Sequence, residues 1–183
     1  MKKIIVLLIG VISPLLAQEY SFKLFTGKDV QAIVPFIAQQ RVSEFREYPY
    51  LYEGNIAEDT EHCQWFAQLP HSAVAVAYLA GKPVGFISST SFADFDVHFK
   101  GSIALFENNG LDPHNFIYIP EAIIMPEHRG KSLIEKLHAL IEKHAKSLGY
   151  KGICFAEESH DKHPLKPASY KGREELYFRE GLY

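Results

Sequence analysis

Residues 115–150 read NFIYIPEAIIMPEHRGKSLIEKLHALIEKHAKSLGY, and the expected fold follows from this stretch. Residues 116–125 form a β-branched and aromatic run of strand length, and Pro126 ends it because proline has no N–H for a sheet ladder. From Ser132 the apolar residues recur at helical spacing, as far as Gly149, which is a typical left-handed C-cap. The stretch therefore predicts a strand, a short basic turn and a long amphipathic helix.

The turn, residues 128–132, has the features of an anion site. Its backbone N–H groups lie at the start of the expected helix, where the first few have no intrahelical acceptor. The helix dipole and the cations Arg129 and Lys131 favour a bound anion, and a phosphate fits such a place well. An ordinary helix start with two solvated cations is the alternative that these features leave open.

The run IIMPEHRGKS at residues 123–132 resembles motif A of the GNAT superfamily of N-acetyltransferases. The likeness extends to residues 48–54 and 163–170, and so covers most of the chain beyond the first twenty residues or so. It implies an α/β fold in three layers, with a mixed central sheet flanked by helices. Where the motif has two glycines, this chain has Ser132 and Ile134. Glycine there lets a pyrophosphate approach the backbone, so the bulky Ile134 weakens the expectation of full cofactor affinity.

The resemblance also implies a reaction, the direct transfer of an acetyl group from acetyl-CoA to an amine. The amine would belong to a small molecule or a peptide. The pyrophosphate would be held by the turn, and the pantetheine arm would pair with the preceding strand in the manner of an added strand. The implied cofactor-binding residues are Ile123, Ile124, Met125, Arg129, Gly130, Lys131, Ser132 and Leu133.

Two residues are predicted to be catalytic. Glu121 is a lone carboxylate inside an otherwise apolar strand, and Pro120 before it can mark a bulge that re-aims the side chain. Glu121 is therefore the candidate general base, and the alternative is a carboxylate that faces solvent at the strand end. The resemblance implies a tyrosine as general acid for the departing thiolate, and Tyr170 matches the family-like P-x-x-Y segment.

Composition bounds the remaining possibilities. The chain has 183 residues, 47% of them hydrophobic and 22% charged, which is enough for one globular domain. A net charge of −3 gives no basic surface for nucleic acid. No H-E-x-x-H or C-x-x-C pattern occurs, so no metal is expected. Cys63 and Cys154 are interpreted as buried small side chains, with a single disulfide as the alternative in an oxidising compartment.

The first residues have the pattern of a secretory signal peptide. Lys2 and Lys3 precede a short apolar run, residues 4–12, and a small residue, Ala17, follows at a plausible cleavage point. This predicts a signal peptide at residues 1–17, a GNAT-like domain at residues 18–183, and a secreted or periplasmic location. An uncleaved anchor is the alternative.

The other expected elements follow from periodicity and turn chemistry. Thr26 is expected to begin the first helix with a capping box. The expected strands are residues 20–25, 73–79, 84–89 and 152–156, and the expected helices are residues 29–44, 57–69, 94–107 and 170–180.

Two predictions concern the whole chain. The replaced motif glycines favour a degenerate GNAT-like domain that binds a ligand without catalysis, as the alternative to an active enzyme. A GNAT-like domain continues after its last helix with two more strands, and the sequence holds no apolar run for them. The strand at residues 152–156 is therefore expected to keep an open edge. A second copy could cover that edge in a homodimer, a partner could add a strand, or the chain could be a truncated product.

Overall fold

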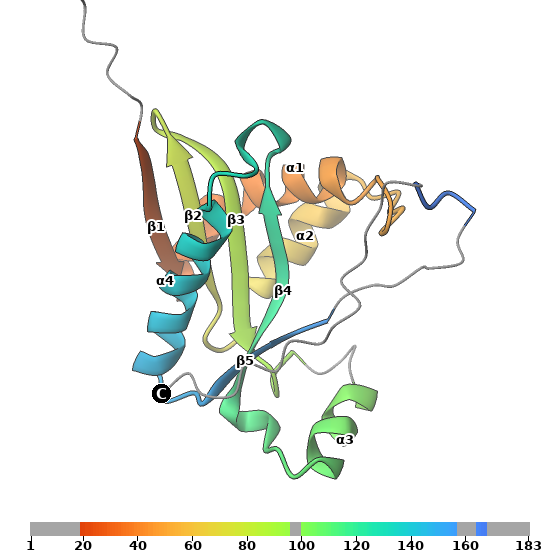
Figure 1. Ribbon diagram of the computed structural model, residues 1–183, viewed down its shortest axis with the longest axis vertical. Helices are drawn as coiled ribbons and strands as arrows, with labels where there is room; N and C mark the ends of the chain where they lie inside the picture. The colour runs from red at the N-terminus through yellow and green to blue at the C-terminus, as the bar shows by residue number, and fades with distance from the viewer. Residues whose placement is uncertain (1–18, 96–99, 157–163, 168–183) are drawn as a thin grey trace, which may run out of the picture.

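The computed structural model describes residues 19–95, 100–156 and 164–167, and these form an α/β fold around one five-stranded sheet (Figure 1). The strands follow the chain in spatial order, and only the last pair is parallel. The strands are β1 (Tyr20–Thr26), β2 (Ala73–Leu79), β3 (Lys82–Ser91), β4 (Phe116–Ile124) and β5 (Gly152–Phe155). The predicted mixed sheet is confirmed.

Helices lie on both faces of the sheet. On one face α1 (Val34–Glu44) and α2 (Ile56–Phe66) cover a core that includes Val74, Val76 and Phe86. On the other face α4 (Leu133–Ser147) packs Leu133, Leu137, Ile141 and Ala145 against a second core. The remaining helical pieces are η1 (Gly27–Ile33), α3 (Lys100–Asn108), η3 (Pro113–Asn115) and η4 (Pro126–His128). The three layers expected from the resemblance are present.

The β2–β3 hairpin shows why local sequence predicted so much of this sheet. Ala80 and Gly81 both have positive φ, 50° and 75°, which suits the two-residue turn that matches the twist of paired strands. The crossover from β4 through α4 to β5 likewise follows the predicted strand, turn and helix. Gly149 has φ of 88°, so the predicted left-handed end of the helix is confirmed.

Two predicted helices differ from the structure. The predicted helix at residues 29–44 is a 3-10 segment, η1, followed by α1, and Pro35 lies in the first turn of α1. Thr26 makes no side-chain cap hydrogen bond, so the predicted capping box is wrong. The predicted helix at residues 94–107 is wrong at its start, because residues 94 and 95 are not helical and Phe95 is buried in the core; α3 is described from Lys100, and residues 96–99 lie outside the described part.

Several predictions fall outside the described residues. The signal peptide, the final helix at residues 170–180 and Tyr170 stay predictions for this reason. Across residues 19–95, 100–156 and 164–167, no helix has the length and apolar character needed to cross a membrane. Within the same described part, β5 pairs with β4 alone, which agrees with the expected open edge but does not test a homodimer.

Candidate functional site

A buried ion-pair cluster joins α1, α2 and β4. Arg41 pairs through Nη1 with Glu121 Oε1, and its Nε lies 2.5 Å from Asp59 Oδ1. The Asp59 side chain is fully buried, and those of Arg41 and Glu121 are 13% and 10% exposed. Tyr52 donates its hydroxyl to Asp59 Oδ2 at 3.3 Å. One guanidinium therefore serves two carboxylates, and the cluster carries one net negative charge.

A bulge in β4 aims Glu121 at this cluster. Across β3 and β4, Ser88 opposes Glu121 and Thr90 opposes Tyr118, so two residues of β4 stand against one of β3. The extra residue falls at Ile119 and Pro120, where proline has no N–H for a regular ladder. Tyr118, before the bulge, faces α1 and α2, and Glu121, after it, faces the same side. In a regular strand, residues three positions apart face opposite sides, so without the bulge Glu121 would face α4. The predicted bulge is confirmed.

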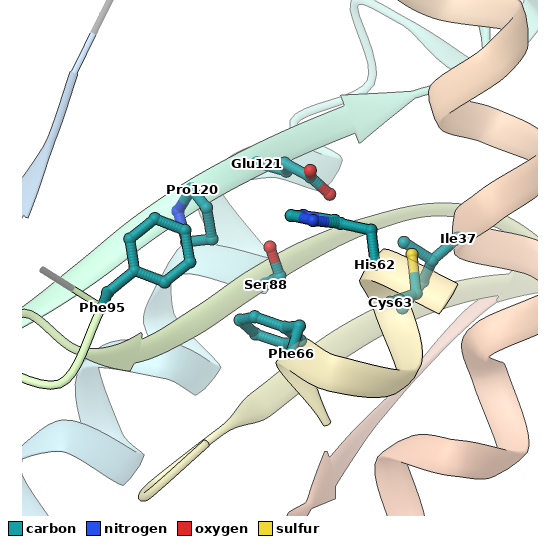
Figure 2. A pocket seen from close by; sticks show the side chains of 8 residues that line it. All are labelled: Ile37, His62, Cys63, Phe66, Ser88, Phe95, Pro120 and Glu121. Atoms are coloured by element: carbon teal, nitrogen blue, oxygen red, sulfur yellow. The ribbon is translucent and has the colours of Figure 1, made fainter. Parts of the chain in front are cut away.

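A small pocket adjoins Glu121 on the face of the sheet that α1 and α2 cover (Figure 2). Most of its wall is apolar, and Glu121, Ser88 and His62 are its polar members. Ser88 is 2% exposed, and its hydroxyl is buried without a hydrogen-bond partner in the part of the chain that the structure describes. The complete lining is Ile37, His62, Cys63, Phe66, Ser88, Phe95, Pro120 and Glu121.

Cys63 is part of the apolar wall and not a nucleophile. Burial raises the pKa of the Cys63 thiol to about 11, and the guanidinium of Arg41 offsets only part of that rise. A nucleophilic cysteine needs its thiolate form near neutral pH. Covalent catalysis through Cys63 is therefore unfavourable, and both cysteines are free thiols, as the first interpretation of the sequence had them.

Beyond the bulge, the backbone of β4 is open on the side of β5. The parallel pairs run from Phe116 and Gly152 to Ile119 and Phe155, and then the strands diverge (Figure 1). On its other side β4 stays paired with β3 as far as Ile124. The described part of the chain thus leaves an edge of β4 at which the amides of an extended ligand can pair.

The turn after β4 has the backbone of an anion site in part. Gly130 and Ser132 have positive φ, 71° and 54°, and α4 begins directly afterwards at Leu133. The first N–H groups of α4 have no acceptor inside the helix. The Arg129 N–H, however, donates to the Pro126 carbonyl at 3.2 Å. The N–H groups of residues 130–133 are therefore better placed for a phosphate than the N–H of Arg129, and the predicted phosphate site stays a prediction.

The two cations of the turn already have partners. Arg129 donates from Nε to the Ile124 carbonyl at 2.9 Å and pairs through Nη2 with Glu44 at 2.5 Å. Lys131 donates to the Glu127 carbonyl at 2.9 Å and to the Tyr20 hydroxyl at 3.1 Å. The Arg129 and Lys131 side chains make these contacts at the surface, where a bound anion can replace them at small cost.

The side chains of the predicted cofactor strand belong to the core. Ile123 is 4% exposed and faces α1 and α2, whereas Ile124 and Met125 pack on the α4 side. Ile134, which stands at a motif glycine, is also packed against the core of α4. The backbone of this strand, rather than its side chains, is therefore the part that suits an extended ligand.

Sequence reasoning found Glu121 and the turn but missed the groups around them. Asp59 lies on the same helical face as Cys63 and Phe66, a spacing that signals a buried carboxylate in need of a cation. No comparable signal marked Arg41 or Ser88, because their roles depend on packing between distant segments. Among the described residues, no group of three or more histidine, cysteine or carboxylate side chains is arranged to hold a metal ion.

Comparison with known proteins places this geometry in a family. The model of the acetyltransferase (GNAT) family matches residues 38–166, a range that includes the ion-pair cluster, the turn and every residue of the pocket except Ile37. A comparison with curated protein sequences gives no match.

Several solved structures share the fold at low sequence identity. The aminoglycoside N-acetyltransferase AAC(6')-Iy in complex with CoA is similar at 13% identity and a TM-score of 0.56, over 79% of this chain and 82% of that one. An aminoglycoside acetyltransferase from an uncultured soil metagenomic sample, in complex with sisomicin, is similar at 14% identity and a TM-score of 0.53, over 87% of this chain and 95% of that one. A possible acetyltransferase from Clostridium difficile 630 is similar at 14% identity and a TM-score of 0.54, over 77% of this chain and 82% of that one.

Proposed function

Because the chain belongs to the acetyltransferase (GNAT) family, we propose that it transfers an acetyl group from acetyl-CoA to the amine of a small molecule by direct attack. One observation carries the proposal. The buried carboxylate of Glu121 stands directly after the bulge, where the open backbone of β4 meets the pocket. This position supports a role for Glu121 as a base between the amine of the acceptor and the thioester of acetyl-CoA.

Glu121 acts as the general base in this proposal. The amine nitrogen forms a bond to the acetyl carbonyl carbon, and Glu121 accepts the proton that the nitrogen loses. The carbon–sulfur bond breaks, and the sulfur leaves as the thiol of CoA after taking up a proton, for which Tyr170 is the proposed donor. Arg41 holds the Glu121 carboxylate beside the pocket through their ion pair.

Binding of the acetyl donor falls to the backbone. Residues 130–133 would hold the pyrophosphate at the N-terminus of α4, and the open edge of β4 at Ile123, Ile124 and Met125 would hold the pantetheine arm. The acceptor is proposed to be a small molecule because the similar structures include an aminoglycoside acetyltransferase in complex with an aminoglycoside, sisomicin. A peptide amine is the alternative.

Glu121→Gln tests the base directly. The variant keeps the size of the side chain, so we expect unchanged CoA affinity in calorimetry and a fall in kcat of about a hundredfold to ten-thousandfold. The rate of acetyl transfer is measured from the release of the CoA thiol. Glu107→Gln, at an exposed position on α3, is the matched control and should retain full activity. Full activity of Glu121→Gln would remove Glu121 as the base.

A GNAT-like domain that binds a ligand without catalysis is the second candidate, and two observations favour it. Ile134 stands at a motif glycine position, and its side chain is packed against the core. Arg129 donates a hydrogen bond to the Ile124 carbonyl, the group that the pantetheine arm would approach. The same calorimetry decides between the candidates. Binding of acetyl-CoA with no transfer to any amine supports this one, and an absence of binding at millimolar ligand contradicts the enzyme.

A further inference from the structure

Ser88 is the most unusual polar group in the pocket. Nearly all buried hydroxyl groups in proteins have a hydrogen-bond partner, and those that lack one call for an explanation. Ser88 Oγ has no partner in the described part of the chain, although the residue is 2% exposed. Figure 2 shows the hydroxyl pointing towards the side of the pocket where Glu121 and the His62 ring lie. An unused hydrogen-bonding group therefore faces the proposed base.

Ser88 and Glu121 form a matched pair across two strands. They are direct partners in the β3–β4 register, and both face α1 and α2 because of the bulge. Side chains that oppose each other in this way have Cβ atoms about 5 Å apart, so one small group can contact both. Arg41 contacts Oε1 of Glu121, so a ligand would approach the other carboxylate oxygen. A serine hydroxyl accepts a hydrogen bond as readily as it donates one.

The charge of the site suits a single cation. Asp59 and Glu121 share one guanidinium, so the formal charges of these three side chains sum to −1. An ammonium group has three N–H donors and no acceptor, which matches a carboxylate oxygen and a hydroxyl oxygen side by side. An acceptor with its own carboxylate next to the amine would bring like charges together at Glu121.

The walls of the pocket restrict the shape of what carries that ammonium. Phe66 from α2, Phe95 from the segment after β3 and Pro120 from the bulge surround Ser88 and Glu121 (Figure 2). All three are rigid and apolar, and Phe66 and Phe95 are buried in the core. A methylene group can lie against such walls, but a branch next to the nitrogen would have to displace a ring.

We propose that this pocket seats the amino group of the acceptor, with Ser88 Oγ and Glu121 as its two hydrogen-bond acceptors. The acceptor class is a primary amine on an unbranched CH2 carbon, without a carboxylate beside it. This inference rests on the proposed function, and it adds Ser88 as the binding residue that selects the acceptor.

Isomeric amines test the shape of the pocket. The full chain should acetylate n-butylamine with a kcat/KM about tenfold or more above that for sec-butylamine, since one misplaced methyl group costs that much in a tight apolar site. Equal rates for the two isomers would overturn the inference and leave the proposed function intact.

Ser88→Ala tests the hydroxyl, and Ser89→Ala is its matched control. Ser89 is also buried without a hydrogen-bond partner in the described part, but alternation along β3 turns it to the α4 side. Ser88→Ala should raise the KM for n-butylamine about tenfold with no change in CoA affinity, because a hydrogen bond to a charged group is lost. Ser89→Ala should leave both unchanged, and equal effects of the two variants would overturn the assignment.

A crystal of the full chain soaked in n-butylammonium chloride gives a result that does not depend on turnover. The nitrogen is expected between Ser88 Oγ and Glu121, with the alkyl chain leading out of the pocket. Density there in a protein that acetylates no amine would contradict the proposed function and keep the binding site. An unchanged pocket at saturating ligand would overturn the inference itself.

Discussion

Arg41 gives its guanidinium to two carboxylates that come from different elements. Asp59 is fully buried, and Glu121 is 10% exposed, so neither has water to replace the lost cation. Removal of one member of a buried ion pair is far more costly than the pair itself is stabilising, because the other charge is left uncompensated. The stability of the site should thus depend on Arg41 more than on any surface cation.

Arg41→Met keeps the length of the side chain and removes its charge. We expect it to lower the free energy of unfolding by about 3–5 kcal/mol, measured by urea denaturation. Arg46→Met, at an exposed position beyond the end of α1, is the control and should change stability by less than about 0.5 kcal/mol. Equal stability of the two variants would mean that the cluster tolerates an unpaired charge.

Single residues were predictable where the strand pattern was broken. Glu121 interrupts an apolar run directly after Pro120, and both the inward carboxylate and the bulge followed from that alone. Arg41 could not be assigned in the same way, since its partners lie 18 and 80 positions along the chain and meet it only when α1 packs on α2 and the sheet. The hydrogen bond of the Arg129 amide was not predicted, because the 3-10 turn at Pro126 was not foreseen.

At the scale of elements, the start of α4 is the proposed diphosphate site. Ser132 is its N-cap residue and makes no side-chain cap hydrogen bond, so its side chain can be changed without loss of a cap. Ser132→Asp should weaken CoA binding by on the order of 1–2 kcal/mol, roughly five- to thirtyfold in Kd, because a carboxylate would stand beside the diphosphate. Calorimetry with CoA measures this change.

Ser132→Asn is the matched control for that variant. Asparagine has almost the same size as aspartate, carries no charge, and tolerates the left-handed backbone at φ of 54°. It should bind CoA like the parent chain. If the aspartate and asparagine variants bind CoA equally well, the phosphate does not lie at this helix start.

Element boundaries were predictable where a turn residue fixed them and not elsewhere. Gly149, Pro126 and the Ala80–Gly81 turn each set a boundary through backbone conformation alone. Residues 94–107 were predicted as helix because apolar residues recur near helical spacing from Phe92 through Phe95 to Phe106. These rings instead fill the core beside Tyr118, with centroids 5.9 Å and 5.0 Å from its ring. Tertiary packing of aromatic residues thus overrode a short helical pattern.

For the whole molecule, the buried acidic groups predict sensitivity to alkali. Burial raises the pKa of Cys63 to about 11 and of Cys154 to about 12, from ordinary values near 9.0. Burial, with Cys154 nearby, raises the pKa of Tyr118 to about 12 from 10.0. The folded chain therefore holds these protons after the unfolded chain has lost them. The free energy of unfolding must fall as pH rises above about 9.

Cys63→Ala tests this dependence. Thermal unfolding of the parent chain and of the variant is compared at about pH 8 and about pH 10, the window in which the unfolded thiol ionises and the folded one does not. The variant should be less stable at the lower pH, because it loses buried volume. Between the lower and the higher pH, the Tm of the variant should nevertheless fall less than the Tm of the parent chain. Parallel falls would show that the Cys63 thiol titrates alike in both states.

Because of the bulge at Ile119 and Pro120, the side of the sheet that receives the Glu121 carboxylate depends on the number of residues in β4. One residue more or less before Glu121 would exchange the two faces of the strand and deliver the carboxylate to the opposite side of the sheet. A relative that replaces several side chains of this strand can keep the site, whereas one with a single-residue gap cannot. In an alignment, the count of positions between Tyr118 and Glu121 is therefore more informative about shared activity than the identity of the residues that fill them.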